Sequence, residues 1–365
     1  MAKARSAPDI WLLAAIGIIL SIGIVMVYSA SAVLAFHEYG DRFYYVKRQL
    51  LFAGLGVGAL LFTMNVHYSN WKKWAPAALI VCFGLLVIVL IPGIGVVRGG
   101  ARSWLGISSF GIQPSEFMKL AMILFLSKWL SDKQGTITQF TTGLLPPLGI
   151  LGLAFGLIML QPDLGTGAVM VGASLLLIFT AGARLAHLGA LAGAGVLGMV
   201  GLILAAPYRL KRITSFLDPW SDPLGGGYQI IQSLFAIGPG GLVGLGLGMS
   251  RQKFSYLPEP QTDFIFSILA EELGFIGGAF LILLFLVVIW RGIRAAIAAP
   301  DTFGSLLAVG ITGIIGVQVL INIGVVIGMM PVTGITLPLV SHGGSSLTLL
   351  LTALGILLNI SRYSR

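Results

Sequence analysis

The acidic residues of this chain can be considered one by one, because it has only 13 Asp and Glu in 365 residues. Some lie in polar connections, where exposure to solvent accounts for them: Asp9, Glu38, Asp41, Asp132 and Asp301. The others border or enter long apolar segments: Glu116, Asp163, Asp218, Asp222, Glu259, Asp263, Glu271 and Glu272. A carboxylate next to a membrane can act as a general base. We therefore expect a catalytic centre among this second set, on the outer face of a membrane.

Asp263 belongs to the segment from 257 to 266, LPEPQTDFIF, which carries the strongest signal. Two prolines stiffen this segment, and Asp263 precedes an apolar stretch that is expected to be helical. A carboxylate at this point either caps the helix N-terminus or acts as a general base, and its position alone favours neither role.

Glu271 and Glu272 follow about two helical turns later, roughly 12 Å along the helix axis. Adjacent residues cannot share a helix face, so at most one of them is expected to point toward a site below Asp263. Ionisable residues inside a membrane are usually functional or paired, and we favour a structural ion pair with Lys119 for these two acids. For Glu116 and Lys119 themselves, an ion pair and a catalytic role are both left open.

Two groups of basic residues could bind an anionic ligand. Arg102 lies beside Trp104, and a guanidinium can hold a diphosphate through two parallel hydrogen bonds. The alternative is an arginine that extends along an aromatic belt toward the membrane surface. The run YRLKR from 208 to 212 repeats the same chemistry and equally fits a contact with lipid headgroups; its cations are Arg209, Lys211 and Arg212.

Two other acidic motifs resemble turns. Asp163 precedes the stretch LGTG and is expected to cap a helix. Asp218 and Asp222 are each followed by proline, and for them a turn is favoured over a metal site. The histidines have no metal-ligand spacing: they are His37, His67, His187 and His342.

The composition is that of an integral membrane protein, with 57% hydrophobic residues, 10% charged residues and a mean hydropathy of +0.98. A soluble domain carries about a quarter charged residues, so a cytosolic enzyme, a disordered chain and a secreted disulfide scaffold are excluded. The net charge of +9 is scattered among apolar segments. This scatter favours anionic lipids or an anionic substrate as partners and argues against nucleic acid.

Apolar runs of about 20 residues predict an all-α fold with about ten transmembrane helices in a single membrane domain, 1–365. The predicted spans are 10–34, 48–66, 74–92, 114–131, 143–160, 164–182, 185–206, 264–290, 303–329 and 337–360. Positive residues near both termini assign that side to the cytoplasm, although the outer side is not depleted of positive charge: they are Lys3, Arg5, Arg362 and Arg365. The aromatic-rich segment 207–263, between the seventh and eighth helices, is predicted to be a large external loop that folds as a lid or cleft wall.

Small residues are expected to be packing devices. The single cysteine, Cys82, lies in an apolar run and is expected to be a buried thiol. The chain has 50 glycines. They are dense between 189 and 201, where we expect them to let helices approach closely.

Five motifs carry a resemblance to a known family. They are QPSEFMK from Gln113, QPDLGT from Gln161, DPLGGGYQ from Asp222, LPEPQTDFIF from Leu257 and LPLVSHGGSS from Leu337. In this order they resemble the signature segments of the SEDS family (shape, elongation, division and sporulation; FtsW, RodA and SpoVE type). The resemblance covers nearly the whole chain and is closest to the sporulation branch of the family.

This resemblance implies a peptidoglycan glycosyltransferase of the bacterial cytoplasmic membrane. Such an enzyme polymerises lipid II, an undecaprenyl-diphosphate-linked substrate, at the outer face, here for the spore cortex or the division septum. It works with a class B penicillin-binding protein and is surrounded by membrane lipids. The family's essential aspartate maps to Asp263 and its loop arginine to Arg102, although many members place that arginine directly before the tryptophan, where this chain has Ser103. His342 stands where most members have tyrosine.

The expected mechanism is a single displacement with inversion, in which Asp263 is the general base. External cations, or a divalent ion such as Mg or Mn, would neutralise the diphosphate leaving group. The candidate substrate-binding residues are Arg102, Lys119, Glu116, Arg212, Lys211, Glu259, Asp163 and Ser341. Two other functions stay open: a lipid II flippase that uses intramembrane charges, and a non-catalytic scaffold of the division or sporulation machinery.

Overall fold

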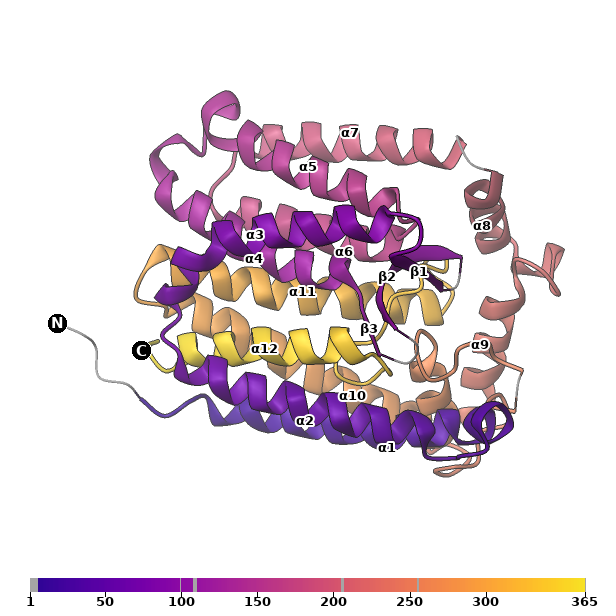
Figure 1. Ribbon diagram of the computed structural model, residues 1–365. Coiled ribbons are helices and arrows are strands. Elements are labelled where there is room, and N and C mark those ends of the chain that lie inside the picture. Colours follow the sequence, from indigo (N-terminus) through magenta and orange to yellow (C-terminus); the bar gives the residue numbers. More distant parts are fainter. Residues whose placement is uncertain (1–5, 99, 108–109, 205–206, 255, 365) are drawn as a thin grey trace.

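The computed structural model describes residues 6–98, 100–107, 110–204, 207–254 and 256–364. These residues form a bundle of long helices with one small sheet (Figure 1). The α-helices are α1 (Ile10–Tyr39), α2 (Tyr44–Asn65), α3 (Ser69–Leu90), α4 (Pro114–Asp132), α5 (Leu145–Met159), α6 (Leu164–Thr180), α7 (Leu185–Leu204), α8 (Pro207–Leu217), α9 (Tyr228–Gly240), α10 (Ile265–Ile297), α11 (Thr302–Val326) and α12 (Gly344–Ser361). The short helical turns are η1 (Gln134–Thr136), η2 (Phe140–Leu144) and η3 (Pro219–Ser221), and the strands are β1 (Gly95–Arg98), β2 (Ala101–Ile107) and β3 (Phe110–Ile112).

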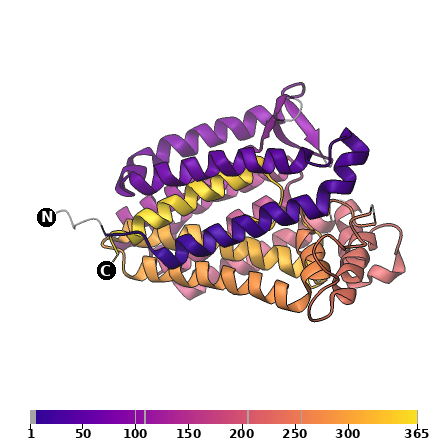
Figure 2. The same ribbon diagram turned by 90° about the horizontal axis from the view of Figure 1, so that it is seen from below.

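The N- and C-terminal segments lie at the same end of the bundle (Figure 1). The amide of Ser6 donates a hydrogen bond of 3.1 Å to the carbonyl of Arg362. Asp9 caps α1 by accepting two amide hydrogen bonds of its first turn, and it also binds Arg291 of α10. The sheet, α8 and α9 lie at the opposite end of the bundle (Figure 1). Figure 2 shows the whole molecule from below. The connections that carry the predicted site residues therefore share one end of the bundle.

Each predicted membrane span overlaps a helix. Within the described residues, seven helical segments are long and apolar enough to cross a membrane: α1, α2, α3, the η2–α5 segment (Phe140–Met159), α10, α11 and α12. The remaining predicted spans correspond to α4, which carries several charged residues, to α6, which has 17 residues, and to α7. An all-α membrane fold is confirmed, and the exact number of ten spans remains a prediction.

The last helix begins later than predicted, at Gly344 instead of residue 337. Pro338 lacks an amide hydrogen, so the chain before α12 cannot complete a helical ladder. Ser341 stabilises the irregular path instead: its Oγ accepts from the amide of Leu337 at 2.7 Å and donates to the carbonyl of Thr262 at 2.6 Å. The segment before α12 is thereby attached to the segment before α10.

The glycines between 189 and 201 do not mediate close helix packing, so that prediction is wrong. A methyl group placed on any of them would meet no atom within 4 Å, because α7 lies at the edge of the bundle (Figure 1). Close approach occurs elsewhere, for example where α2 meets α12. There a methyl group on Gly355 would lie 2.1 Å from Oγ1 of Thr63. Cys82, on α3, is buried as expected.

A three-stranded antiparallel sheet in the order β1, β2, β3 joins α3 to α4. Val96 pairs with Trp104, and Leu105 pairs with Ile112. The sequence pattern did not predict these strands. The sheet fixes Trp104 beside the start of α4.

The segment 207–263 is more regular than predicted. It contains α8, η3 and α9, and the ring centroids of Trp220 and Phe235 lie 5.8 Å apart. The expectation that its aromatic residues indicate a folded segment agrees with this packing. Its assignment as a separate external loop remains a prediction.

Helix α10 is interrupted at Gly274, whose φ of 66° and ψ of −164° suit only glycine. The backbone of 241–246 satisfies the groups that this break leaves unpaired. The carbonyls of Glu271 and Glu272 accept from the amides of Leu245 and Gly246 at 2.9 and 3.0 Å, and the amides of Phe275 and Ile276 donate to the carbonyls of Gly241 and Leu242 at 2.9 and 3.1 Å. The segment 241–246 is therefore hydrogen-bonded to α10 on both sides of the break.

Candidate functional site

A cavity of about 880 Å³ opens at the end of the bundle opposite the termini. Its wall is formed by α2, β2, the start of α4, the turn before α6 and the segments 259–263, 332–336 and 342–346. Predicted site residues from distant parts of the chain meet there: Glu116, Lys119, Asp163, Glu259 and Asp263. The sequence motifs thus converge on one cavity.

Asp263 lies one residue outside the cap position of α10, because the N-cap residue is Phe264. Its backbone is held by Asn322 of α11, whose Nδ2 donates to the carbonyls of Asp263 and Ile335 at 2.8 and 2.7 Å. The Asp263 side chain is half-buried and lines the cavity. This geometry places a carboxylate on the cavity wall at a rigidly held backbone position.

Glu259 is exposed and lines the same cavity. Its φ of 51° lies in the left-handed region, which is uncommon for a residue with a side chain. Its Oε2 accepts from Thr262 Oγ1 at 3.1 Å and from Gln261 Nε2 at 3.3 Å. These two contacts hold the Glu259 side chain in the turn that precedes Asp263 and offset the cost of its left-handed backbone conformation.

Glu116 and Lys119 form a buried ion pair on α4, with 2.8 Å between Oε1 and Nζ. Lys119 Nζ also donates to Gln318 Oε1 of α11 at 3.1 Å. The predicted pairing of Lys119 with Glu271 and Glu272 is therefore wrong. The nearest acid in the sequence satisfies the lysine, because residues three apart share a helix face.

Glu271 and Glu272 are structural acids outside the cavity. Glu271 accepts from Ser250 Oγ at 2.5 Å. Glu272 pairs with Lys253 Nζ at 3.0 Å and accepts from Ser29 Oγ of α1 at 2.6 Å. The predicted structural ion pair exists for Glu272, with Lys253 as the cation instead of Lys119, whereas Glu271 accepts hydrogen bonds from a hydroxyl and backbone amides. The two carboxylates attach the segment 248–253 to α10 and α1.

Asp163 caps α6, as expected, because its Oδ1 accepts from the amide of Thr166 at 3.1 Å. Its Oδ2 accepts from Gln113 Nε2 at 2.9 Å and from Ser115 Oγ at 3.0 Å. Both oxygens therefore have protein partners, although the residue lines the cavity. Asp163 joins the start of α4 to the start of α6.

The predicted cations are only partly placed at the cavity. Arg102 is not among its lining residues, whereas Ala101, Ser103 and Trp104 are. Arg209, Lys211 and Arg212 belong to α8, and their side chains lie outside the described part of the structure. Ser341 is buried behind the wall, where it holds Thr262.

Sequence reasoning missed Arg48, which lines the cavity from α2. Its guanidinium lies over the Tyr44 ring, 4.8 Å from the ring centroid. The signal was the clustering of two tyrosines and two cations within YYVKR, the same aromatic and cationic pairing that singled out Arg102. Sequence reasoning also missed Gln318 and Asn322, whose amides are buried on the apolar helix α11.

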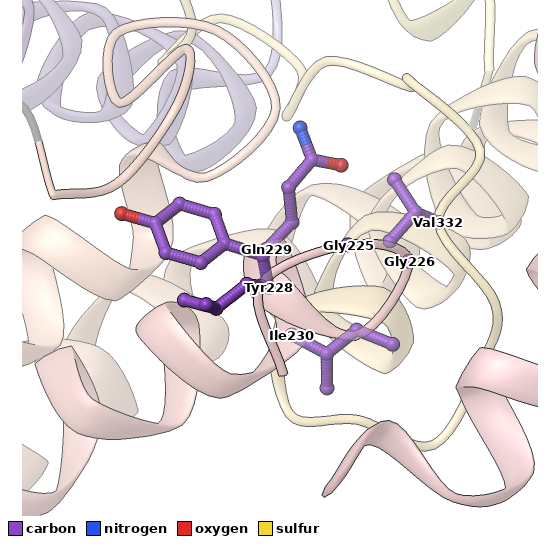
Figure 3. Close-up of a pocket in the computed structure, with 7 residues that line it drawn as sticks. Gly225, Gly226, Tyr228, Gln229, Ile230 and Val332 are labelled. Atoms are coloured by element: carbon purple, nitrogen blue, oxygen red, sulfur yellow. The ribbon is translucent and has the colours of Figure 1, made fainter. Parts of the chain in front are cut away.

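A smaller pocket of about 310 Å³ adjoins the cavity and shares Gln229 and Val332 with it (Figure 3). Gly225 and Gly226 form its floor in a tight turn held by Asp222, whose Oδ2 accepts from the amide of Gly226 at 3.0 Å. The favoured interpretation of Asp222 as a turn residue is confirmed.

Within the residues that the structure describes, no group of three His, Cys, Asp or Glu side chains could by itself hold a metal ion. A cation such as Mg or Mn needs only one or two carboxylates together with substrate phosphates, so its participation stays a prediction from the sequence.

Comparisons with known proteins agree with this arrangement. Residues 10–365 match the FtsW/RodA/SpoVE family, described as "Cell cycle protein". The chain is 62% identical to stage V sporulation protein E of Bacillus subtilis (strain 168), over 100% of both chains. It is 45% identical to the probable peptidoglycan glycosyltransferase FtsW of Trichlorobacter lovleyi, over 97% of this chain and 93% of that one.

Solved structures give the same result. One chain from a study of "polymerization and crosslinking by a peptidoglycan synthase complex" has a TM-score of 0.80 and 31% identity, covering 98% of this chain and 99% of that one. The rod shape determining protein RodA of Thermus thermophilus has a TM-score of 0.70 and 28% identity, covering 98% of this chain and 97% of that one. The apolar helices and these relatives identify a multi-pass protein of the cytoplasmic membrane. With its signature motifs gathered around one cavity, the chain belongs to the FtsW/RodA/SpoVE family, the SEDS family of cell cycle proteins.

Proposed function

We propose that this chain is a peptidoglycan glycosyltransferase that polymerises lipid II at the outer face of the cytoplasmic membrane. One observation carries the proposal: Asp263 and Glu259 share a single cavity wall with Arg48 and with the Glu116–Lys119 pair. The name of the relative that is 45% identical, a probable peptidoglycan glycosyltransferase, supports the same activity.

In the proposed reaction, Asp263 is the general base. The hydroxyl oxygen of one sugar attacks the anomeric carbon of another, the bond from that carbon to the diphosphate oxygen breaks, and the hydroxyl proton passes to Asp263. Asp263 must be ionised to accept this proton. One displacement without a covalent intermediate inverts the anomeric carbon.

We assign the cation for the diphosphate leaving group to Arg48. Arg48 is among the residues that line the cavity, whereas Arg102 is not, and a guanidinium binds phosphate oxygens through parallel hydrogen bonds. The buried Glu116–Lys119 pair supports the wall behind the reacting groups. This assignment replaces the role expected for Arg102.

The proposed partner is a class B penicillin-binding protein that cross-links the product. A structural neighbour comes from a peptidoglycan synthase complex, which supports such a pairing. The similarity to stage V sporulation protein E supports a role in the spore cortex, with the division septum as the other site of action.

A lipid II flippase would need a path of mobile intramembrane charges. The contacts favour the enzyme instead, because Lys119 is paired with Glu116, and Glu271 is held by the segment 248–253. A scaffold function would make no use of the acids on the cavity wall.

The test is polymerisation of purified lipid II by the wild type and by Asp263→Asn, each with and without the cognate penicillin-binding protein. General-base catalysis contributes about 10²- to 10⁴-fold, so Asp263→Asn should lose that factor. Asp41→Asn is the matched control, since Asp41 lies in the connection from α1 to α2 at the same end of the bundle, and its side chain pairs with Lys47. Full activity of folded Asp263→Asn would remove Asp263 as the base, and an inactive wild type with its partner would reject the proposed function.

A further inference from the structure

His342 lines the cavity from the segment that precedes α12. Its backbone amide donates a hydrogen bond of 2.8 Å to the carbonyl of Gln261. Two residues further along the chain from Gln261 stands Asp263, the proposed base. The imidazole therefore belongs to the same piece of cavity wall as the proposed base, although almost 80 residues separate them in the sequence.

The histidine ring is fixed in orientation by two neighbours on α2. Its Nδ1 lies 3.2 Å from Gln49 Oε1, and its ring meets the Tyr45 ring edge-on, with centroids 5.1 Å apart and planes at 84°. Gln49 is completely buried, and its Nε2 donates to the carbonyl of Ser341 at 3.2 Å. The amide oxygen of Gln49 must therefore face the histidine.

This contact determines the tautomer of His342. An amide oxygen only accepts hydrogen bonds, so Nδ1 must carry the proton that it donates. Burial, assisted by the charge of Arg48, lowers the pKa of His342 to about 4, so the ring is neutral at pH 7. In a neutral imidazole with the proton on Nδ1, Nε2 holds a lone pair and acts as an acceptor.

Nε2 remains available toward the cavity. Within the described part of the chain no side chain or backbone group donates to Nε2. This atom is also not among the fully buried side-chain atoms that lack a hydrogen-bond partner, so it is accessible from the cavity. The charged groups that share this cavity wall are Arg48, Glu116, Lys119, Asp163, Glu259 and Asp263. Nε2 is thus an oriented, neutral acceptor beside carboxylates that are also acceptors.

We propose that His342 is a substrate-binding residue whose Nε2 accepts a hydrogen bond from a hydroxyl group of the sugar that occupies the cavity. The inference rests on the proposed function for the identity of that sugar. A diphosphate has no hydrogen to donate at neutral pH and cannot make this contact. In this proposal His342 binds the carbohydrate part of lipid II, while Arg48 binds the phosphate part.

Two substitutions separate the two nitrogen atoms. His342→Asn keeps an amide nitrogen at the position of Nδ1, where it can still donate to Gln49, but has no atom at the position of Nε2. His342→Gln extends far enough to place an amide oxygen near the position of Nε2. His67→Asn is the control, because His67 lies at the other end of the bundle, where its Nδ1 contacts Ser69 Oγ at 2.7 Å.

The experiment measures binding of lipid II to the full chain in detergent by native mass spectrometry, together with KM and kcat for polymerisation. Loss of one hydrogen bond should weaken binding by His342→Asn about three- to tenfold and raise KM to the same extent, with little change in kcat. His342→Gln should recover part of the affinity, and His67→Asn should bind like the wild type. Wild-type affinity and KM in folded His342→Asn would overturn the inference.

A spectroscopic measurement keeps the test independent of catalysis. The chain has four histidines, so nitrogen-15 labelling of histidine gives few resonances, and His342→Asn identifies the pair to be followed. The expected spectrum shows a protonated Nδ1 and an unprotonated Nε2 whose signal moves when lipid II is added. An Nε2 signal unmoved by saturating lipid II would reject the role of His342. If the signal moves but the wild type does not polymerise, the proposed function fails and this binding contact stands.

Discussion

The ammonium group of Lys119 lies 2.8 Å from the carboxylate of Glu116 and 3.1 Å from the amide oxygen of Gln318, so α4 and α11 share one buried cation. Both members of the ion pair are at least nine-tenths buried. A buried pair stabilises a fold weakly as a whole, but removing one partner leaves an uncompensated charge. Removal of either charged partner is therefore expected to weaken the contact between α4 and α11 next to the cavity.

Lys119→Met should destabilise the protein by about 3–5 kcal/mol, because Glu116 would remain buried without its cation. The double variant Glu116→Gln with Lys119→Met should recover much of this loss. Equilibrium unfolding in mixed detergent micelles measures both values. Lys72→Met, which removes a partly exposed partner of Asp132, should cost no more than about 1 kcal/mol. Equal costs for the single and double variants at 116 and 119 would show that the pair is not coupled.

Gly274→Ala should destabilise the break in α10 by more than about 2 kcal/mol, since its backbone region is essentially restricted to glycine. The added methyl group would also lie 2.3 Å from the amide nitrogen of Gly244. Gly149→Ala in α5 is the matched control, because a methyl group there meets nothing within 4 Å, and alanine favours a helix. Thermal unfolding in detergent measures the two variants, and equal melting temperatures would contradict the described break.

Asp163→Ala should cost about 0.5–2 kcal/mol for the lost cap of α6, and more because Gln113 and Ser115 lose their acceptor. Asp163→Asn keeps one oxygen and should cost less than half as much. The comparison of the two variants by unfolding separates hydrogen bonding from charge. A larger loss in the asparagine variant would indicate that the negative charge itself is required.

The stability of the protein should fall as the pH decreases from 6.5 toward 4, in part because of His342. Its pKa is lowered from 6.5 to about 4 by burial and by Arg48. In this window the unfolded chain binds a proton that the folded chain does not, so the free energy of unfolding decreases by up to about 1.4 kcal/mol per pH unit. His342→Asn should therefore show a smaller decrease in the free energy of unfolding as the pH falls toward 4. Melting temperatures measured between pH 4.5 and 7.5 will show this difference. Parallel pH profiles for the two proteins would contradict the shifted pKa.

The helical spans and the convergence of the motifs could be predicted from the sequence, because the length of each apolar run and the order of the motifs can be read from it directly. The partners of charged residues could not. Lys253 binds Glu272 from an irregular segment 19 residues earlier in the chain, and no local pattern predicts that contact. Arg102 and Arg48 have the same aromatic context in the sequence, and only the three-dimensional structure shows that Arg48 reaches the cavity wall.

The break in α10 also separates the helix into two parts with different roles. Its part from 275 to 297 is about 34 Å long, which by itself exceeds the roughly 30 Å of hydrocarbon in a bilayer. The part from 265 to 273 is therefore not needed to cross the bilayer, and it follows directly on the segment 259–263 that lines the cavity. Glu271 and Glu272 stand on this outer piece, so their carboxylates are shielded by neighbouring protein, and lipid does not have to accommodate them.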